Sequence, residues 1–201
     1  MKLVFKGKFK GMDQLPLGDL PPNAVKFKEP ETMDKLVVKV ILFTIPALLL
    51  VALIMIGSYL LHGKFNIDYV PFPLVVGLLA SIPGMFLHEL LHAVCFGKGA
   101  YVEFYIALKE GLMFVVSTSP ITKQRFIFLS LLPNLVLGWL PFLVWAVLPY
   151  GEIYSNVLFV FSILNILGGG GDYMNTYNAI RQMPKGSIQQ LSGFNSYWFM
   201  P

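Results

Sequence analysis

Four stretches of mainly apolar residues constrain the fold of this 201-residue chain more than any other feature. They cover residues 36–61, 69–96, 126–148 and 156–180. At about 1.5 Å per helical residue, each stretch is long enough to cross the hydrocarbon core of a bilayer. Hydrophobic residues make up 56% of the chain and charged residues only 13%, which is too apolar for a soluble domain. The sequence therefore predicts an all-α polytopic membrane protein with four transmembrane helices.

The other residues divide the chain into three parts. Residues 1–35 are an N-terminal arm, rich in lysine and proline, that lacks the apolar stretch of a signal peptide. This arm is either a solvated tail or an ordered strap across one face of the protein. Residues 36–181 form the four-span domain, and residues 182–201 form a polar tail.

A β-hairpin is expected between the second and third spans. Residues 100–119 contain two runs of β-branched and aromatic residues, separated by a turn with Gly111. The hairpin is either a structural connector or an edge strand that pairs with an extended substrate beside a functional site.

The basic residues indicate orientation. Eight of the fifteen lysines and arginines lie in residues 1–39, four in residues 98–125 and two in residues 181–185. Only Lys64 lies on the other side of the predicted membrane. Because cytoplasmic loops carry most of the positive charge, both termini and the hairpin are predicted to be cytoplasmic. This distribution of lysines and arginines accounts for the net charge of +4. The basic residues form no patch interleaved with aromatic residues, so the sequence does not predict a nucleic-acid partner.

The second span contains the sequence His88-Glu89-Leu90-Leu91-His92, which has the pattern H-E-x-x-H. Residues four apart share one face of a helix, so His88 and His92 can bind one metal ion together. Glu89 can then act as a general base toward a water on that metal. Ionisable residues at membrane depth are costly and usually functional, so a chance match is the less attractive interpretation.

A catalytic zinc ion needs a third protein ligand and an open position. Cys95 is about 10 Å along the same helix from His88, and His62 is on the opposite side of the membrane. Glu103 and Glu110 belong to the hairpin, near the water interface. As a single cysteine, Cys95 also excludes a disulfide framework.

Depth selects Asp172, the acidic residue of the fourth span. The second span enters at about residue 70 and the fourth at about residue 154, both running inward, so His88 and Asp172 each lie about 27 Å from the entry. The four glycines at 168–171 either form a packing face, allow close approach, or let the helix unwind before Asp172. Zinc is therefore predicted to be bound by His88, His92 and Asp172.

These motifs resemble the site-2 protease family of intramembrane zinc metalloproteases. More closely, they are similar to a family of small bacterial membrane proteins described as zincin peptidases, in which H-E-x-x-H and G-G-x-G-D recur. The resemblance extends from residues 20–24 to the fourth span, and it implies one zinc ion with Glu89 as the base. The aspartate stands in a Gly-Gly-Asp-Tyr context, whereas better-known site-2 proteases have Asn-Pro-Asp-Gly or Leu-Asp-Gly, and no PDZ-like insertion fits the loops.

The leading hypothesis is hydrolysis of peptide bonds of membrane protein substrates, at or within the bilayer of a bacterial cell membrane. Asn134 and Asn165 are possible oxyanion or substrate contacts, although an intramembrane asparagine more often joins helices by hydrogen bonds. A non-catalytic metal-binding scaffold or sensor needs the ligands but not Glu89. A transporter component is a weaker alternative, because four spans without an internal repeat are unusual for one. The sequence gives no oligomeric state.

Overall fold

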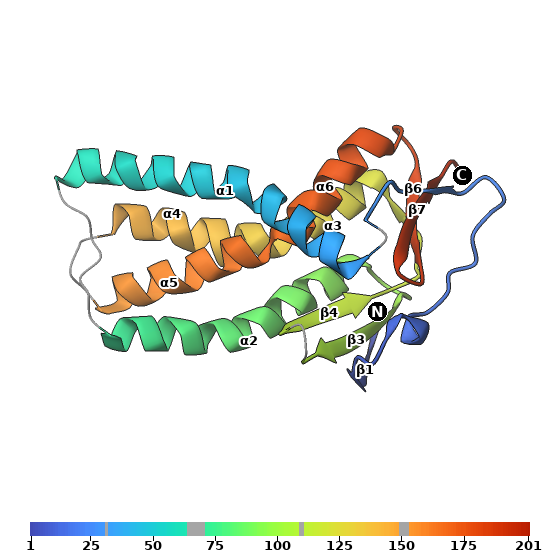
Figure 1. The fold of residues 1–201 in the computed structure, drawn as a ribbon, viewed down its shortest axis with the longest axis horizontal. Coiled ribbons are helices and arrows are strands. Elements are labelled where there is room, and N and C mark those ends of the chain that lie inside the picture. Colours follow the sequence, from blue (N-terminus) through green and yellow to red (C-terminus); the bar gives the residue numbers. More distant parts are fainter. Residues whose placement is uncertain (31, 64–70, 109–110, 149–152) are drawn as a thin grey trace.

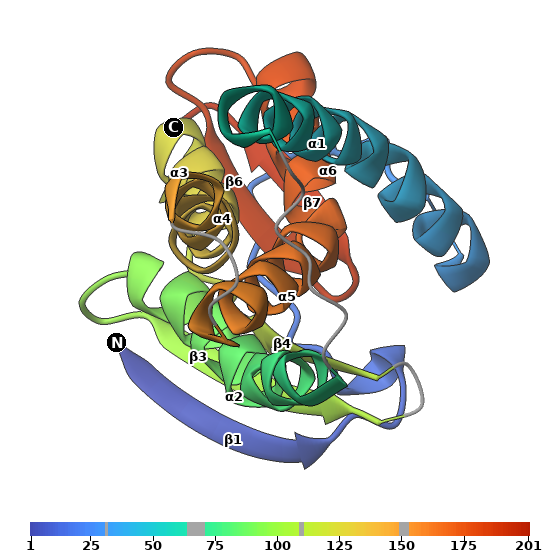
Figure 2. The ribbon, with the colours of Figure 1, turned by 90° about the vertical axis from the view of Figure 1, so that its left-hand side faces the viewer.

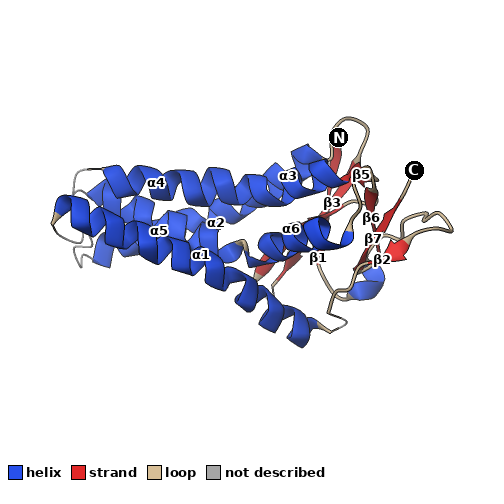
Figure 3. Cartoon of the chain, turned by 90° about the horizontal axis from the view of Figure 1, so that it is seen from above, coloured by secondary structure: helices blue, strands red, loops and turns tan. Residues whose placement is uncertain are grey.

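The computed structural model describes residues 1–30, 32–63, 71–108, 111–148 and 153–201. The expected hairpin turn at Lys109 and Glu110 lies outside these residues, as does Lys64. Helices form an elongated bundle, and short strands gather at one end of it together with both termini (Figures 1 and 3). The α-helices are α1 (Met33–His62), α2 (Pro71–Cys95), α3 (Lys123–Pro133), α4 (Leu140–Val147), α5 (Ile153–Gly168) and α6 (Gly170–Gln182).

The helices account for the four apolar stretches. In the described part of the chain, three helices are long and apolar enough to cross a membrane: Lys35–His62, Phe72–Cys95 and Lys123–Val147. The fourth stretch is a pair of helices, Tyr154–Gly168 and Gly170–Gln182, with a bend of 44° between them. The chain thus has three candidate spans, or four if the bent pair is one span. Leucines such as Leu49, Leu53 and Leu60 are exposed on α1, as expected of a surface that contacts lipid.

The third stretch is one continuous helix with an irregular middle. Between α3 and α4 lies the π-helical segment η2 (Asn134–Trp139). It begins directly after Pro133, which has no N–H to donate, and Pro141 follows in the first turn of α4. Single π-helical turns occur frequently at functional sites. This one begins at a fully buried asparagine, Asn134.

The expected hairpin is present in the first of two sheets. Strands β3 (Tyr101–Ala107) and β4 (Leu112–Val116) pair antiparallel. The arm adds β1 (Lys2–Lys8), which pairs parallel with β3, so the strand order is β1-β3-β4 and β4 is an edge strand. This sheet lies beside the C-terminal half of α2 (Figure 1), and the view down the bundle shows it on the same side as α2 (Figure 2).

The second sheet was not expected, and the all-α class needs correction for this reason. Its strands are β2 (Val25–Lys26), β5 (Ile121–Thr122), β6 (Ile188–Ser192) and β7 (Asn195–Phe199), in the order β2-β7-β6-β5. The predicted polar tail is thus a hairpin, and the arm is an ordered strap rather than a solvated tail. Strands formed by the two ends of a chain leave little trace in local hydropathy, because each finds its partner far away in sequence.

The segment 9–24 joins the two sheets, and we call this segment and both sheets the cap. Phe9 N donates to Ile106 O in the first sheet, and Gly193 N donates to Pro16 O at the second, each over 2.9 Å. An apolar cluster of the cap combines residues of the segment with residues of both sheets: Phe9, Leu15, Tyr105, Phe114, Val116, Leu191 and Phe194. The cap is therefore a packed unit at the end of the bundle.

Candidate metal centre

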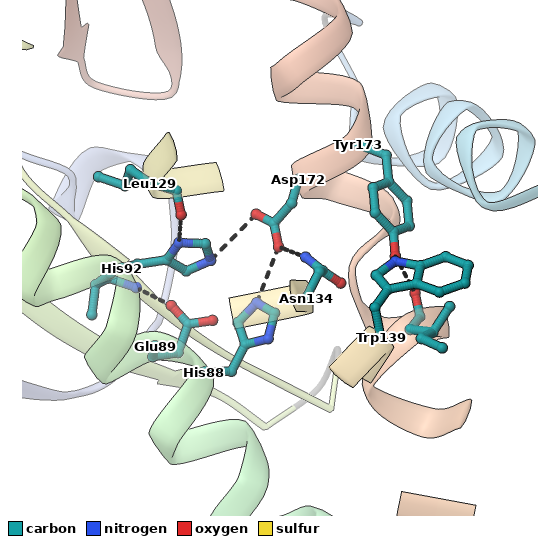
Figure 4. A network of polar contacts seen from close by, with 10 residues as sticks. His88, Glu89, His92, Leu129, Asn134, Trp139, Asp172 and Tyr173 are labelled. Carbon is teal, nitrogen blue, oxygen red and sulfur yellow. Dashed lines mark hydrogen bonds and ion pairs between the residues drawn. The ribbon is translucent and has the colours of Figure 1, made fainter. Parts of the chain in front are cut away.

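The two histidines of the H-E-x-x-H motif project from α2 toward α6. Their rings lie 4.8 Å apart between centroids, one helical turn from each other. Asp172 approaches from α6, with Oδ2 at 3.1 Å from His88 Nε2 and Oδ1 at 3.3 Å from His92 Nε2 (Figure 4). One potential ligand atom from each of the three residues lies within 4.8 Å of the others. The structure thus brings together the three residues that the sequence singled out.

Asp172 reaches this position because the chain breaks between α5 and α6. Gly169 separates the two helices, and Asp172 falls in the first turn of α6, where the helix dipole favours a carboxylate. A side chain on Gly169 would overlap the amide of Asn134, and one on Gly170 would overlap Val40 and Thr44 of α1. These two glycines therefore allow close packing at the break.

The first and last glycines of the run, Gly168 and Gly171, are not closely packed. A side chain on Gly168 or Gly171 would meet no atom within 4 Å, and both residues line a cavity. The glycine run therefore serves packing at its centre and leaves space at its two ends.

Two further groups orient the ligands. His92 Nδ1 lies 2.9 Å from the carbonyl oxygen of Leu129, so the ring donates there and presents Nε2 with its lone pair to the centre. Asn134 Nδ2 donates to Asp172 Oδ2 over 2.7 Å. Outer contacts of this kind fix the orientation of metal ligands in proteins. Two imidazoles and a carboxylate, held in this way, fit the donor set of a catalytic zinc site that keeps one position open.

The two asparagines proposed as oxyanion or substrate contacts have different surroundings. Asn134 is at the centre, but its amide is engaged by Asp172, as Figure 4 shows. Asn165 donates Nδ2 to Phe161 O of its own helix and is not among the residues that line the cavity.

The other candidate ligands lie elsewhere. Cys95 is buried, and its carbonyl oxygen accepts from Arg125 Nε over 2.5 Å. Glu103 pairs with Lys6 Nζ at 3.1 Å and accepts a hydrogen bond from Tyr105. Burial, together with that neighbouring carboxylate, raises the pKa of Tyr105 above its usual range. Glu110 lies outside the described residues.

Glu89 lies beside the edge of the first sheet. Its Oε2 accepts a hydrogen bond of 2.9 Å from Val115 N, a backbone group of β4. Since that N–H points to Glu89, it is not part of the ladder with β3. The carboxylate is therefore held next to an unpaired strand edge, within the same cavity as the two histidines and Asp172.

The cavity has a volume of about 240 Å³ and has walls from both the bundle and the cap. The bundle contributes the histidines, Glu89 and Asp172, with Phe96, Phe126, Leu129 and Asn175. The cap contributes Phe114 and Val115 of β4 with Gln189 and Leu191 of β6. Sequence reasoning missed Gln189, Leu191 and the Leu129 carbonyl. Two β-rich runs separated by Gly193, a signal for a hairpin, could have revealed the first two.

The chain was compared with known families, curated proteins and solved structures. No curated protein and no solved structure matches it. The family described as "Putative zincin peptidase" matches residues 81–188, more than half of the chain. The matched region contains H-E-x-x-H and Asp172. The chain belongs to this zincin peptidase family, whose description indicates a metallopeptidase-like function.

Proposed function

We propose that this protein is a zinc-dependent peptidase, similar to site-2 proteases, that hydrolyses peptide bonds of membrane protein substrates at or within the bilayer. The observation that carries the proposal is the convergence of His88, His92 and Asp172 with Glu89 on one cavity. Zinc, when bound, lowers the pKa of water and polarises a carbonyl group. The three residues would hold it, and the apolar helices would hold the protein in the membrane.

Glu89 is the proposed general base and acid. Its carboxylate would take a proton from the attacking water and pass it to the leaving amine. The hydrogen bond from Val115 N keeps the carboxylate on the cavity wall. Because the candidate metal ligands line the same cavity, a scissile amide bound there would be within reach of both Glu89 and the zinc ion.

The edge of β4 supports recognition of an extended peptide. It is the outer strand of its sheet, and backbone groups alternate along antiparallel strands, so Met113 also directs its N–H and C=O to the edge beside α2. A substrate segment that adds to this edge gains main-chain hydrogen bonds. A helical substrate must unwind for this, because its carbonyls are otherwise already hydrogen-bonded.

The topology proposal places both termini and the metal centre on the cytoplasmic side. Support comes from the basic residues of 1–39 and 98–125 and from the position of both termini at the cap end (Figure 3). A fluorescent protein fused to the C-terminus should be fluorescent in cells. A dark fusion, with the periplasmic reporter alkaline phosphatase active at the same position, would reverse the orientation.

Substitution of Glu89 tests the function. Purified wild-type protein, loaded with zinc, is incubated with a library of synthetic transmembrane peptides, and cleavage is followed by mass spectrometry. Glu89→Gln should lower cleavage by a factor of about 10² or more and leave the zinc content unchanged. Glu29→Gln, a substitution in the segment that follows β2, is the matched control and should cleave like wild type. Equal cleavage by wild type and Glu89→Gln would refute the hydrolytic role, and zinc binding with no cleavage by wild type would favour a metal-binding scaffold.

A further inference from the structure

Gln189 is a cap residue that faces the candidate metal centre. It lies on β6, between β5 and β7, paired with Ile121 on one side and with Trp198 on the other. Its side chain lines the same cavity as His88, His92 and Asp172, and the residue is only 2% exposed. Pairing on both sides fixes the backbone at this point, so the amide is presented from a rigid element.

The amide nitrogen of Gln189 has no hydrogen-bond partner among the residues that the structure describes. In the part of the chain that the structure describes, seven buried side-chain N and O atoms lack a hydrogen bond, and Gln189 is the one residue among their owners that lines the cavity. The neighbouring Gln190 differs, because its Nε2 donates to Asp19 O over 3.3 Å and it does not line the cavity. Buried donors are normally satisfied. A free donor on the wall of a ligand-sized cavity therefore indicates a partner that binds there.

We propose that Gln189 Nε2 donates a hydrogen bond to a backbone carbonyl of the bound peptide. The inference rests on the proposed peptidase function. A peptide that adds to the β4 edge would enter the cavity that Val115 of β4 lines together with Gln189 and Leu191 of β6. Its carbonyls alternate in direction, so those that do not pair with β4 need donors from another element. Gln189 supplies a neutral donor, which is independent of pH and indifferent to the side chains of the substrate.

Two zinc-binding probes separate this role from metal binding. The hydroxamate of N-acetyl-trialanine has a metal-binding group and peptide carbonyls, whereas octanohydroxamic acid has the same metal-binding group on a hydrocarbon chain. Affinities are measured by isothermal titration with the zinc-loaded full chain in detergent. Gln189→Met keeps the length of the side chain and removes the donor. Gln190→Met is the matched control on the same strand, facing away from the cavity.

The expected result is a loss of about tenfold in affinity for the peptide hydroxamate in Gln189→Met, as for one lost hydrogen bond, with unchanged affinity for octanohydroxamic acid. Gln190→Met should bind both probes like wild type. Equal affinities of Gln189→Met and wild type for the peptide probe would overturn the inference, as would an equal loss for both probes. Zinc content and melting temperature are measured alongside to identify a misfolded variant. If Gln189→Met misfolds, Gln189→Glu is used in its place. If neither probe binds zinc-loaded wild type, the proposed metal centre itself fails.

Discussion

The two ends of the helical bundle are stabilised in different ways. Toward the end away from the cap, α1, α4 and α5 pack through an apolar cluster that includes Val51, Phe142 and Trp145. At the cap end, α2, α3 and α6 pack through a further apolar cluster, which includes Cys95, Phe126 and Ala179, and polar contacts join these helices as well. Arg125 and Lys123, from the start of α3, donate to the last carbonyls of α2 and α6, including those of Cys95 and Met183.

The far end is thus a unit of apolar helix packing, whereas the cap end also holds the candidate metal centre. Apolar packing tolerates many substitutions of similar size, because it depends mainly on volume. The cap end places three candidate ligands and two orienting groups within one network, in which displacement of one member affects the others. We therefore expect substitutions within this network to alter metal binding, and substitutions at the far end to alter stability alone.

The largest effect is expected for Gly169→Ala. The added methyl group overlaps Asn134, whose amide positions Asp172, so both the break between α5 and α6 and the ligand must shift. Zinc affinity should fall by about 100-fold or more, and the unfolding free energy by about 3 kcal/mol. Competition with a fluorescent chelator and thermal unfolding measure the two quantities. Gly171→Ala, where the methyl group meets open space, is the control and should fold and bind zinc like wild type.

At the other end, Phe142→Ala should separate stability from metal binding. Phe142 is fully buried and packs against the rings of Trp145 and Phe159. Its truncation should cost about 3 kcal/mol of stability in detergent and leave one zinc ion per chain. The neighbouring Leu143 is exposed, so Leu143→Ala should change neither quantity. Loss of zinc from a folded Phe142→Ala protein would show that the two ends are coupled.

A smaller effect is expected for Asn134→Ala. The substitution removes the donor to Asp172 Oδ2 but leaves all three ligands in place, so zinc affinity should fall by about 10- to 100-fold. Asn165→Ala breaks a hydrogen bond within α5 only and should leave the affinity unchanged. A greater loss of zinc affinity in Asn165→Ala than in Asn134→Ala would contradict the proposed positioning role of Asn134.

The smallest expected effect is a pH dependence of the stability of the cap, which arises from Glu29. Glu29 Oε2 accepts from Ser196 N at β7, and burial raises the pKa of Glu29 above the ordinary value of 4.5. The folded protein therefore holds this proton to higher pH than the unfolded chain, and its stability falls as pH rises above 4.5 toward the raised pKa. Glu29→Gln keeps the acceptor without titrating. Its melting temperature should exceed that of wild type at neutral pH, and the difference should shrink on acidification; a difference independent of pH would contradict this cause.

The sequence predicted well the long apolar helices and the convergence of His88, His92 and Asp172. Long apolar runs specify helices wherever they pack, and H-E-x-x-H has a fixed geometry on one helix. Asp172 was found from depth alone, since two helices that run in the same direction reach the same level after the same number of residues. The hairpin β3–β4 followed from two β-rich runs close in sequence.

The second sheet of the cap was missed for a physical reason. Strand β2 pairs with β7 across about 170 residues, and each is too short for its own pattern to specify a partner. Tertiary contacts, not local preference, decide such pairing. The position of Gln189 depends on the pairing of β6 with β5, which is also distant in sequence. A hairpin signal in residues 182–201 therefore does not by itself show that Gln189 lines a cavity with residues of α2 and α6.

The zinc content of purified protein tests the central claim most directly. Wild type, His92→Ala and Asp172→Ala are purified in detergent, equilibrated with a slight excess of zinc, freed of unbound metal and analysed by mass spectrometry of the metal. We predict one zinc ion per chain in wild type and a loss of stoichiometric zinc in both variants, because each lacks one of three ligands. Stoichiometric zinc in folded Asp172→Ala would contradict the centre described above.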